Sequence, residues 1–259
     1  MQSGYVALLD VLGFSSFVSS DGAFDRLQQY QQYLHDALGK KNGASVVESV
    51  VFSDSIVLTT KDDSEDSFRA LILRCSRVFG LMLQHEIPLR GAIAHGSYLR
   101  SSTGTTGVFV AGKAIIDAYK FETAQDWVGI MLAPSAIAQV RDLAKRCEIP
   151  SDANMSKKNL VALRKRLPWA AFVQETYLGI PFHDVDRPYF GFAVVPSDGN
   201  AEIPAILNSL TRSLEALDWL MSVAPDPSAQ AKCHEARSWL AVVRLKWEKV
   251  EAEWKKFDQ

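Results

Sequence analysis

Two aspartates, Asp10 and Asp54, are the residues whose sequence context most favours chemistry. Asp10 ends the apolar run 5–9 and is soon followed by Gly13, a pattern typical of a buried strand that ends in a tight loop before a helix. Asp54 interrupts a second apolar run, 50–58, where an unpaired carboxylate would be costly to bury. Two hard oxygen ligands on a rigid sheet favour a divalent-metal site for phosphoryl or nucleotidyl chemistry.

Each aspartate also has a purely structural interpretation. Asp10 could cap the helix that follows it, because Asp is a common N-cap residue. Asp54 could be a turn residue of a hairpin, since Asp tolerates turn conformations. The five apolar residues before Asp10, and the presence of a second carboxylate in a similar setting, favour metal binding over capping.

Composition limits the class of protein. The chain has 259 residues, 47% of them hydrophobic, which is enough for one substantial core or one domain with an appendage. The net charge of −2 gives no broad basic face for nucleic acid, so nucleic acid is not expected as a partner. The basic clusters at 157–158 and 164–166 are interpreted as solvated surface.

The cysteines and the apolar runs indicate a compartment. Cys75, Cys147 and Cys233 are widely spaced and odd in number, so they predict neither a zinc site nor a disulfide framework. No stretch resembles a signal peptide, and no apolar run reaches the roughly 18 residues of a membrane-spanning helix. We therefore expect a soluble cytoplasmic protein with no membrane partner.

Apolar periodicity predicts alternating strands and helices up to about residue 146. Strands are expected at 4–12, 45–60 (two runs), 89–99, 108–112 and 128–132, and helices at 24–39, after 62–66, after 112 and at 134–146. The stretch 101–107, rich in Ser, Thr and Gly, is interpreted as a flexible turn or flap. This order predicts an α+β sandwich on a mixed or antiparallel sheet.

The character of the chain changes after residue 150. We predict a domain at 1–150, followed by a C-terminal extension at 151–259 that packs on it. The extension combines a basic helix, strand-like runs at 169–177 and 189–195, and long helices at 203–222 and 226–257. The expected buried anchors of the two long helices are Trp219, Leu220, Trp239, Leu240, Val243, Leu245 and Trp247.

Four motifs in this order resemble the class III nucleotidyl cyclase catalytic domain, over about residues 4–140. The first two are 8–14, similar to the Asp-x-x-Gly-Phe element with the first metal aspartate, and 52–55, similar to the strand turn with the second. The strand 90–96 resembles the family's Arg-x-Gly-Ile-x-x-Gly motif, and 112–122 resembles its Gly-x-x-Val-Asn-x-Ala-x-Arg-Leu-Glu helix.

The resemblance implies a class III cyclase-like sandwich and a head-to-tail homodimer with active sites at the interface. It implies that Asp10 and Asp54 hold two Mg²⁺ or Mn²⁺ ions, which bind the triphosphate and activate the ribose 3′-hydroxyl for attack on the α-phosphorus. The same resemblance places the β- and γ-phosphates on the loop amides of Val11, Leu12, Gly13 and Phe14.

The departures from the family motifs concern the base and the transition state. The residues that read a purine base in the family align with Val50 and Phe109, neither of which can hydrogen-bond a base edge through its side chain. The family's Asn and Arg align with Ile116 and Lys120. Lys120 keeps the charge without the bidentate fork, and Asp117, one position away, could replace the Asn. These alignments make Lys120 and Asp117 the catalytic candidates.

Other polar and aromatic residues of these strands have weaker claims. Arg100 is a candidate contact to the triphosphate. Arg90 is expected to hold the end of the sheet or a carboxylate, with a direct contact to the nucleotide as the alternative. His95 is interpreted as a strand-end histidine rather than a catalyst. Tyr98 and Phe109 could stack on a base, but an aromatic residue in a strand is more often part of the core.

Retained metal aspartates with altered base readers resemble the pyrimidine cyclases of bacterial Pycsar antiphage systems. That resemblance implies conversion of UTP to cyclic UMP and pyrophosphate, with a product that activates a separate effector. Uridylate is favoured over cytidylate by its frequency in the family, not by any residue of this chain. A cytidylate cyclase, a purine cyclase and a non-catalytic cyclase-like sensor remain the alternatives.

Overall fold

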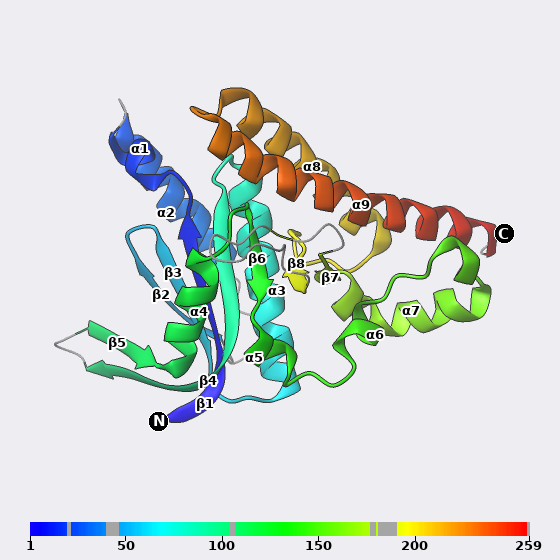
Figure 1. Cartoon of the computed structure of the whole chain (residues 1–259), viewed down its shortest axis with the longest axis horizontal. Helices are drawn as coiled ribbons and strands as arrows, with labels where there is room; N and C mark the ends of the chain where they lie inside the picture. Colours follow the sequence, from blue (N-terminus) through cyan, green and yellow to red (C-terminus); the bar gives the residue numbers. More distant parts are fainter. Residues whose placement is uncertain (20–21, 40–46, 104–106, 177–179, 181–190, 258–259) are drawn as a thin grey trace.

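The computed structural model of the chain describes residues 1–19, 22–39, 47–103, 107–176, 180 and 191–257. Within them an eight-stranded sheet has the order β2-β3-β1-β4-β6-β8-β7, and β5 pairs with β4 outside this path (Figure 1). The strands are β1 (Gln2–Val11), β2 (Val47–Phe52), β3 (Ser55–Thr60), β4 (Leu89–Thr103), β5 (Gly107–Gly112), β6 (Gly129–Leu132), β7 (Val173–Glu175) and β8 (Phe192–Val194).

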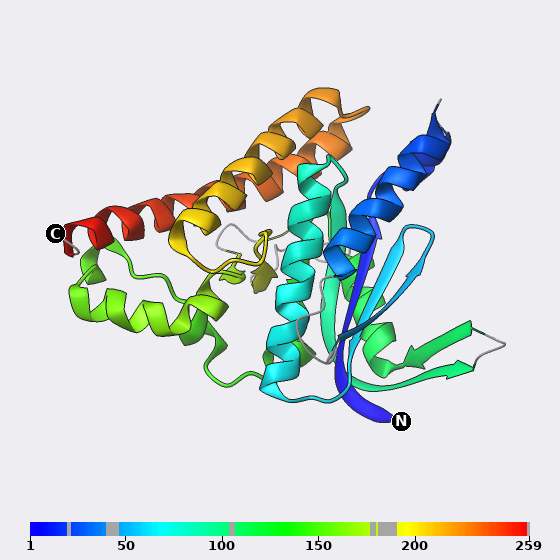
Figure 2. The ribbon, with the colours of Figure 1, turned by 180° about the vertical axis from the view of Figure 1, so that it is seen from behind.

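The helices cover both faces of this sheet. They are α1 (Phe14–Ser19), α2 (Ala23–Gly39), α3 (Glu65–Gln84), α4 (Lys113–Thr123), α5 (Pro134–Ile137), α6 (Leu143–Cys147), α7 (Lys157–Ala170), α8 (Ile203–Val223) and α9 (Pro227–Phe257), with a 3₁₀ turn at Asp152–Asn154. Helices α2 and α3 lie on one face and α4 on the other, as the two opposite views show (Figures 1 and 2).

Strand β1 is central, and its alternation explains the two layers. Tyr5, Ala7 and Leu9 belong to the large core on the α3 side, whereas Val6 packs with Ala114 of α4. Successive side chains of a strand point to opposite faces, so an apolar run buried on both sides is expected here. The strand pairs antiparallel with β3 and β4, and β4 pairs parallel with β6. The prediction of an α+β fold on a mixed sheet is confirmed.

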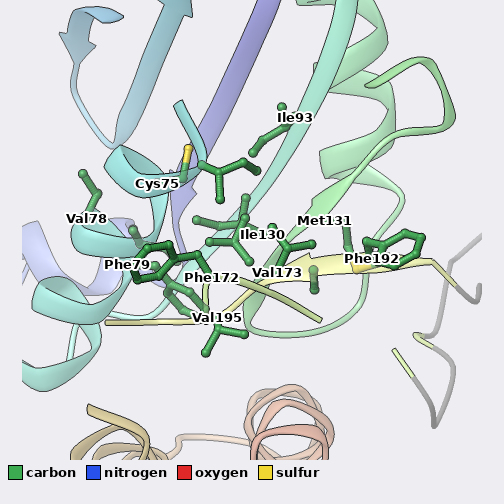
Figure 3. Close-up of a cluster of buried hydrophobic side chains, with 14 of the residues drawn as sticks. Cys75, Val78, Phe79, Ile93, Ile130, Met131, Phe172, Val173, Phe192 and Val195 are labelled. Carbon is green, nitrogen blue, oxygen red and sulfur yellow. The ribbon is translucent and has the colours of Figure 1, made fainter. Parts of the chain in front are cut away.

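The large core joins the first 150 residues to the rest of the chain. Phe79 of α3, Ile130 of β6 and Val173 of β7 lie in one cluster of buried side chains, together with Phe172 and Val195 (Figure 3). Strand β8 pairs with β6, so the strands of the extension continue the same sheet. The division into domains at residue 150 remains a prediction, but the sheet and the core both cross that point.

Most of the predicted elements are present, and two of them differ in detail. Residues 101–103 continue β4 and pair with β5, so the predicted flap is largely a hairpin, with 104–106 outside the described residues. The helix predicted at 134–146 is broken into α5 and α6, because Asp142 adopts a left-handed φ of 54°.

Two of the predicted anchors of the long helices are wrong. Trp219 is 45% exposed and Leu245 is 56% exposed, whereas Trp239, Val243 and Trp247 are buried. The α8–α9 pair buries one stripe of each helix, and Trp219 and Leu245 lie outside it.

Candidate active site

Asp10 and Asp54 come together because three antiparallel strands meet there. Asp10 lies one residue before the end of β1 and is paired in register with Ser55 of β3, directly after Asp54. The amide of Val11 donates to the carbonyl oxygen of Asp54 over 3.2 Å. The two-residue turn between β2 and β3 requires a left-handed residue, and Ser53 takes that conformation with a φ of 57°. The predicted pairing of the two aspartates therefore has a structural basis.

The electrostatic setting of Asp10 is unfavourable to its charge. Burial, followed by the negative charges of Glu122 and Asp54, raises the pKa of Asp10 from 3.8 to about 6, and Arg90 only partly offsets this. The same two aspartates, after burial, raise the pKa of the neighbouring Tyr30 to about 12. In the described part of the chain, the carboxylates of Asp10 and Asp54 neither accept a hydrogen bond nor form an ion pair. A bound cation would relieve this excess of negative charge.

A buried ion pair lies beside Asp10. Arg90 faces Asp10 across the β1–β4 register, and its Nε donates to Glu122 Oε1 over 2.5 Å. Glu122, on α4, is 3% exposed, and the second arm of Arg90 donates to the carbonyl oxygen of Gln125 over 3.1 Å. Arg90 thus holds a carboxylate, which is one of the two roles considered for it. Glu122, Gln125 and Tyr30 are neighbours of the site that sequence reasoning had not selected.

Two of the four backbone amides in the loop after Asp10 are used in hydrogen bonds of the fold. The amide of Leu12 donates to the carbonyl oxygen of Pro88 over 2.9 Å, and that of Val11 to Asp54. In the described residues, the amides of Gly13 and Phe14 have no such partner, and Gly13 adopts a φ of 77° that favours glycine. Of the four amides predicted to contact phosphate, those of Val11 and Leu12 are already hydrogen-bonded, which leaves those of Gly13 and Phe14 as candidates.

The donor set fits a hard divalent cation. Mg²⁺ is commonly held by one or two protein carboxylates together with water and substrate phosphates. No group of three or more His, Cys, Asp or Glu side chains suited to a metal exists within the described ranges. Asp10 and Asp54 therefore match a metal that enters with a phosphate-bearing substrate better than a fully protein-enclosed ion.

The two catalytic candidates on α4, Lys120 and Asp117, differ in whether they already form an ion pair. Lys120 is exposed and has no ion-pair partner among the residues that the structure describes. Asp117 forms an ion pair with Lys113 one helical turn earlier. Lys120 is thus free to contact a substrate or a second protomer, whereas Asp117 must first give up Lys113.

The remaining predicted substrate contacts lie along the β2–β3 and β4–β5 hairpins. Val50 is half-buried opposite Val57. Phe109 is 56% exposed, so the alternative that it packs in the core is wrong, and its contact with a base stays a prediction. Arg100 forms an ion pair with Glu48, which competes with the predicted triphosphate contact.

One chain alone does not bring all the candidates together. Arg90 pairs with Asp10, and Arg100 follows ten residues later on β4, roughly 30 Å along an extended strand. Phe109 pairs with Ser101, so it also lies at the far end. Arg100 and Phe109 therefore lie far from Asp10 along the strand, and a contact with a second copy of the chain is one way for them to share a site with it.

Exposed apolar side chains gather on the elements that would form such a contact. They lie on the two hairpins and on α4: Val51, Phe52, Leu99, Val108, Phe109, Ile116 and Tyr119. Apolar side chains concentrated on neighbouring elements are typical of protein–protein contacts.

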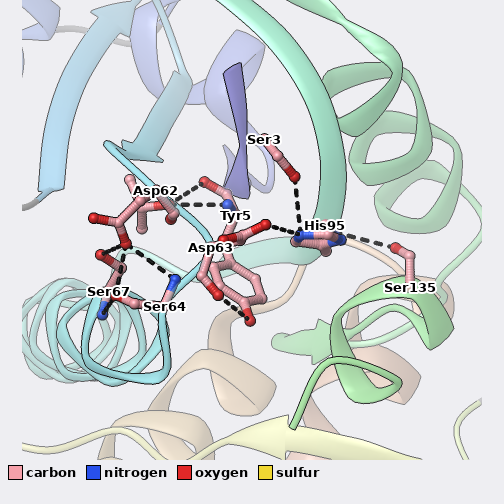
Figure 4. A network of polar contacts seen from close by, with 9 residues as sticks. Ser3, Tyr5, Asp62, Asp63, Ser64, Ser67, His95 and Ser135 are labelled. Carbon is pink, nitrogen blue, oxygen red and sulfur yellow. Dashed lines mark hydrogen bonds and ion pairs between the residues drawn. The ribbon is translucent and has the colours of Figure 1, made fainter.

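A second polar cluster lies at the opposite end of β1 (Figure 4). The carboxylate of Asp62 accepts from the hydroxyls of Ser64 and Ser67, and Thr60 bonds to the backbone of Tyr5. His95 approaches Asp63, with 3.8 Å between Nε2 and Oδ2, and its amide donates to Ser135. These contacts hold His95 within the fold, although it lies in the middle of β4 and not at a strand end.

Several solved structures are similar to this chain. The guanylate cyclase domain of RhGC from Catenaria anguillulae, in complex with GTP, is 11% identical with a TM-score of 0.47, over 75% of this chain and 97% of that one. The adenylyl cyclase CyaB from P. aeruginosa is 13% identical with a TM-score of 0.44, over 76% and 96%. The monomeric guanylyl cyclase domain of the RhoGC fusion protein from Blastocladiella emersonii is 13% identical with a TM-score of 0.43, over 54% and 85%.

Comparisons with protein families and with curated proteins found no match. Across the described ranges, no helix combines the length and the apolar character needed to cross a membrane.

Proposed function

We propose that this protein is a metal-dependent nucleotide cyclase that converts UTP to 3′,5′-cyclic UMP and pyrophosphate. The observation that carries the proposal is the pair Asp10 and Asp54, two carboxylates brought together at the ends of strands, neither of which forms an ion pair with a described side chain. When bound, two Mg²⁺ or Mn²⁺ ions would neutralise the triphosphate and activate the ribose 3′-hydroxyl. Cyclisation needs no covalent intermediate on the protein, only positioning and charge stabilisation.

The residues of the chain have distinct roles in this proposal. Asp10 and Asp54 hold the metal-bound triphosphate, and the amides of Gly13 and Phe14 donate to its terminal phosphates. Lys120 of a second protomer stabilises the charge that develops on the phosphates. Asp117, once released from Lys113, would orient the ribose.

A homodimer is part of the same proposal. The distance along β4 and the exposed apolar side chains of the hairpins and α4 support a head-to-tail pair. In that arrangement Val50 and Phe109 of one protomer line the base pocket above the aspartates of the other. Two side chains without hydrogen-bonding groups support a base other than the purines, read by shape or by backbone groups.

The biological role follows from the resemblance of the motifs rather than from any contact. We propose that the cyclic nucleotide is a second messenger in antiphage defence and acts on a separate effector. Cyclic CMP is the second candidate product, because nothing in Val50 or Phe109 distinguishes uracil from cytosine.

The decisive experiment is incubation of the purified protein with each of the four ribonucleoside triphosphates and Mn²⁺, followed by mass spectrometry. We expect cyclic UMP from wild type and none from Asp54→Ala, with circular dichroism showing that the variant is folded. A purine product would replace the pyrimidine assignment. No product from any triphosphate, together with unchanged metal binding in Asp54→Ala, would favour the non-catalytic sensor.

A further inference from the structure

A cavity of about 430 Å³ lies between the loop after Asp10 and the turn that joins α8 to α9. Leu12 lines it from the loop and Phe17 from α1. Leu220 and Ala229 line it from α8 and α9. Its volume lies within the range of about 300–1,000 Å³ that is typical of small-molecule sites. The proposed metal pair and base pocket lie outside this space, whereas Gly13, whose amide is proposed to contact the phosphates, also lines it.

The lining of this cavity is mainly apolar and is not filled by the chain itself. Val223, at the end of α8, is 52% exposed although it lines the cavity. Leu12 and Phe17 are only half-buried. A large apolar side chain left open to a concave space gains free energy when an apolar group covers it, by about 25 cal/mol per Å². The cavity therefore favours an apolar occupant over water.

The charges around the cavity argue against an anionic ligand. Lys232, the cation of the described lining, is paired with Asp126 at 3.2 Å. The carboxylate of Asp226 accepts from the amide of Ala229 over 2.9 Å, and Glu86 adds a second negative charge. A phosphate or carboxylate would therefore enter without a free cation to compensate it.

We propose that this cavity binds a neutral, mainly apolar small molecule with one hydrogen-bonding group. Ser16 and Ser228, on opposite walls, supply hydroxyls that can meet such a group. The ligand contacts Leu12 and Gly13 directly, so its binding is transmitted to the loop that begins at Asp10. The binding site itself does not depend on the proposed cyclase activity.

A titration with indole tests the proposal, because indole is neutral, largely apolar and carries one N–H donor. We expect saturable binding by the full chain labelled with ¹⁵N-glycine, with a shift of the Gly13 amide resonance. Ala229→Phe fills the cavity from the first turn of α9 and is expected to abolish the shift. Ala231→Phe, an exposed position on the same helix that does not line the cavity, is expected to retain it.

Two further arms keep the outcome decisive. Ala224→Phe fills the same cavity from the end of α8 and replaces Ala229→Phe if that variant does not fold. Benzoate, an anion of similar size, is expected to bind at least about tenfold more weakly than indole. Absence of a saturable shift in wild type, an unchanged shift in the filled variants, or equal binding of benzoate would each overturn the proposal.

Discussion

Two aspartates near opposite ends of β1 are in opposite electrostatic situations: Asp10, on the strand itself, and Asp62, which follows β3. At the Tyr5 end, hydrogen bonds from Ser64 and Ser67 hold the pKa of Asp62 below its ordinary value. At the other end, burial and two neighbouring carboxylates raise the pKa of Asp10 to about 6. Both residues are aspartates, so the difference comes from their burial and their neighbours: Asp10 is half-buried beside two carboxylates, whereas Asp62 is exposed and receives hydrogen bonds.

The ionised carboxylate of Asp62 therefore stabilises the fold, whereas that of Asp10 destabilises it. Asp62 receives donors that favour its charged form, so its charge contributes to stability above its ordinary pKa. Asp10 receives no donor within the described residues and costs stability once it ionises. Uncompensated charge of this kind concentrates at functional sites, because ligand or metal binding supplies the missing partner.

The largest expected effect is on product formation. Asp10→Asn should lower it by about 10³-fold or more, because a neutral amide is a poor ligand for Mg²⁺ and cannot replace the charge. The matched variant Asp62→Asn should leave it within about twofold, since Asp62 lies at the other end of the strand. Steady-state assays with UTP and Mn²⁺ measure both, and equal losses would remove the contrast between the two ends.

The next effect concerns the ion pair beside Asp10. Arg90→Met should lower the free energy of unfolding by about 3–5 kcal/mol, because Glu122 is left buried and unpaired. The exposed pair of Arg237 with Asp218 is the control, and Arg237→Met should cost less than about 1 kcal/mol. Urea unfolding at pH 7.5 measures both variants. Similar costs for the two would contradict the burial of the Arg90 pair.

An intermediate effect is expected from the cation of α4. Lys120→Ala should lower kcat/KM for UTP by about 10–100-fold, because one charge on the transition state is lost. Lys120→Arg should restore most of the activity, whereas Lys158→Ala, on α7, should have no effect. Mixing Lys120→Ala with Asp54→Ala tests the dimer, since one intact site per mixed pair should restore part of the activity. No recovery on mixing would argue against sites shared between protomers.

A smaller effect concerns stability and its dependence on pH. Because the pKa of Asp10 is higher in the folded chain than in the unfolded one, its contribution to stability falls as pH rises from about 4 through 6. Above pH 6 the penalty is complete, and partial exposure of Asp10 limits it to about 1–2 kcal/mol. In metal-free buffer at pH 8, Asp10→Asn should therefore be more stable than wild type by this amount. At pH 4 the two should be nearly equal, and thermal unfolding at both values checks the sign.

The smallest effect belongs to the other end of the strand. Ser64 caps α3, and its side chain accepts from the amide of Ser67. Ser64→Ala should cost about 1 kcal/mol without changing kcat. Chemical denaturation and the UTP assay measure the two quantities. A loss of activity larger than the loss of folded protein would show that the two ends are not independent.

Much of the architecture could be predicted because its elements are set by local periodicity. The apolar face of α3 and the all-apolar β6 are buried as their patterns indicate. The break at Asp142 was missed because a left-handed residue without glycine carries little sequence signal. Trp219 and Leu245 were assigned to the core because helical spacing identifies a stripe but not its partner.

The sequence by itself determined the candidates for chemistry: Asp10 after one apolar run and Asp54 within another, with the loop and the helix that follow Asp10. The tertiary structure alone decided what surrounds them. The pairing of Arg90 with Glu122 and the raised pKa of Asp10 depend on residues far apart in the chain. Apolar periodicity predicts which face of a segment packs on the core. The charge balance of a site depends on which segments come together in the fold.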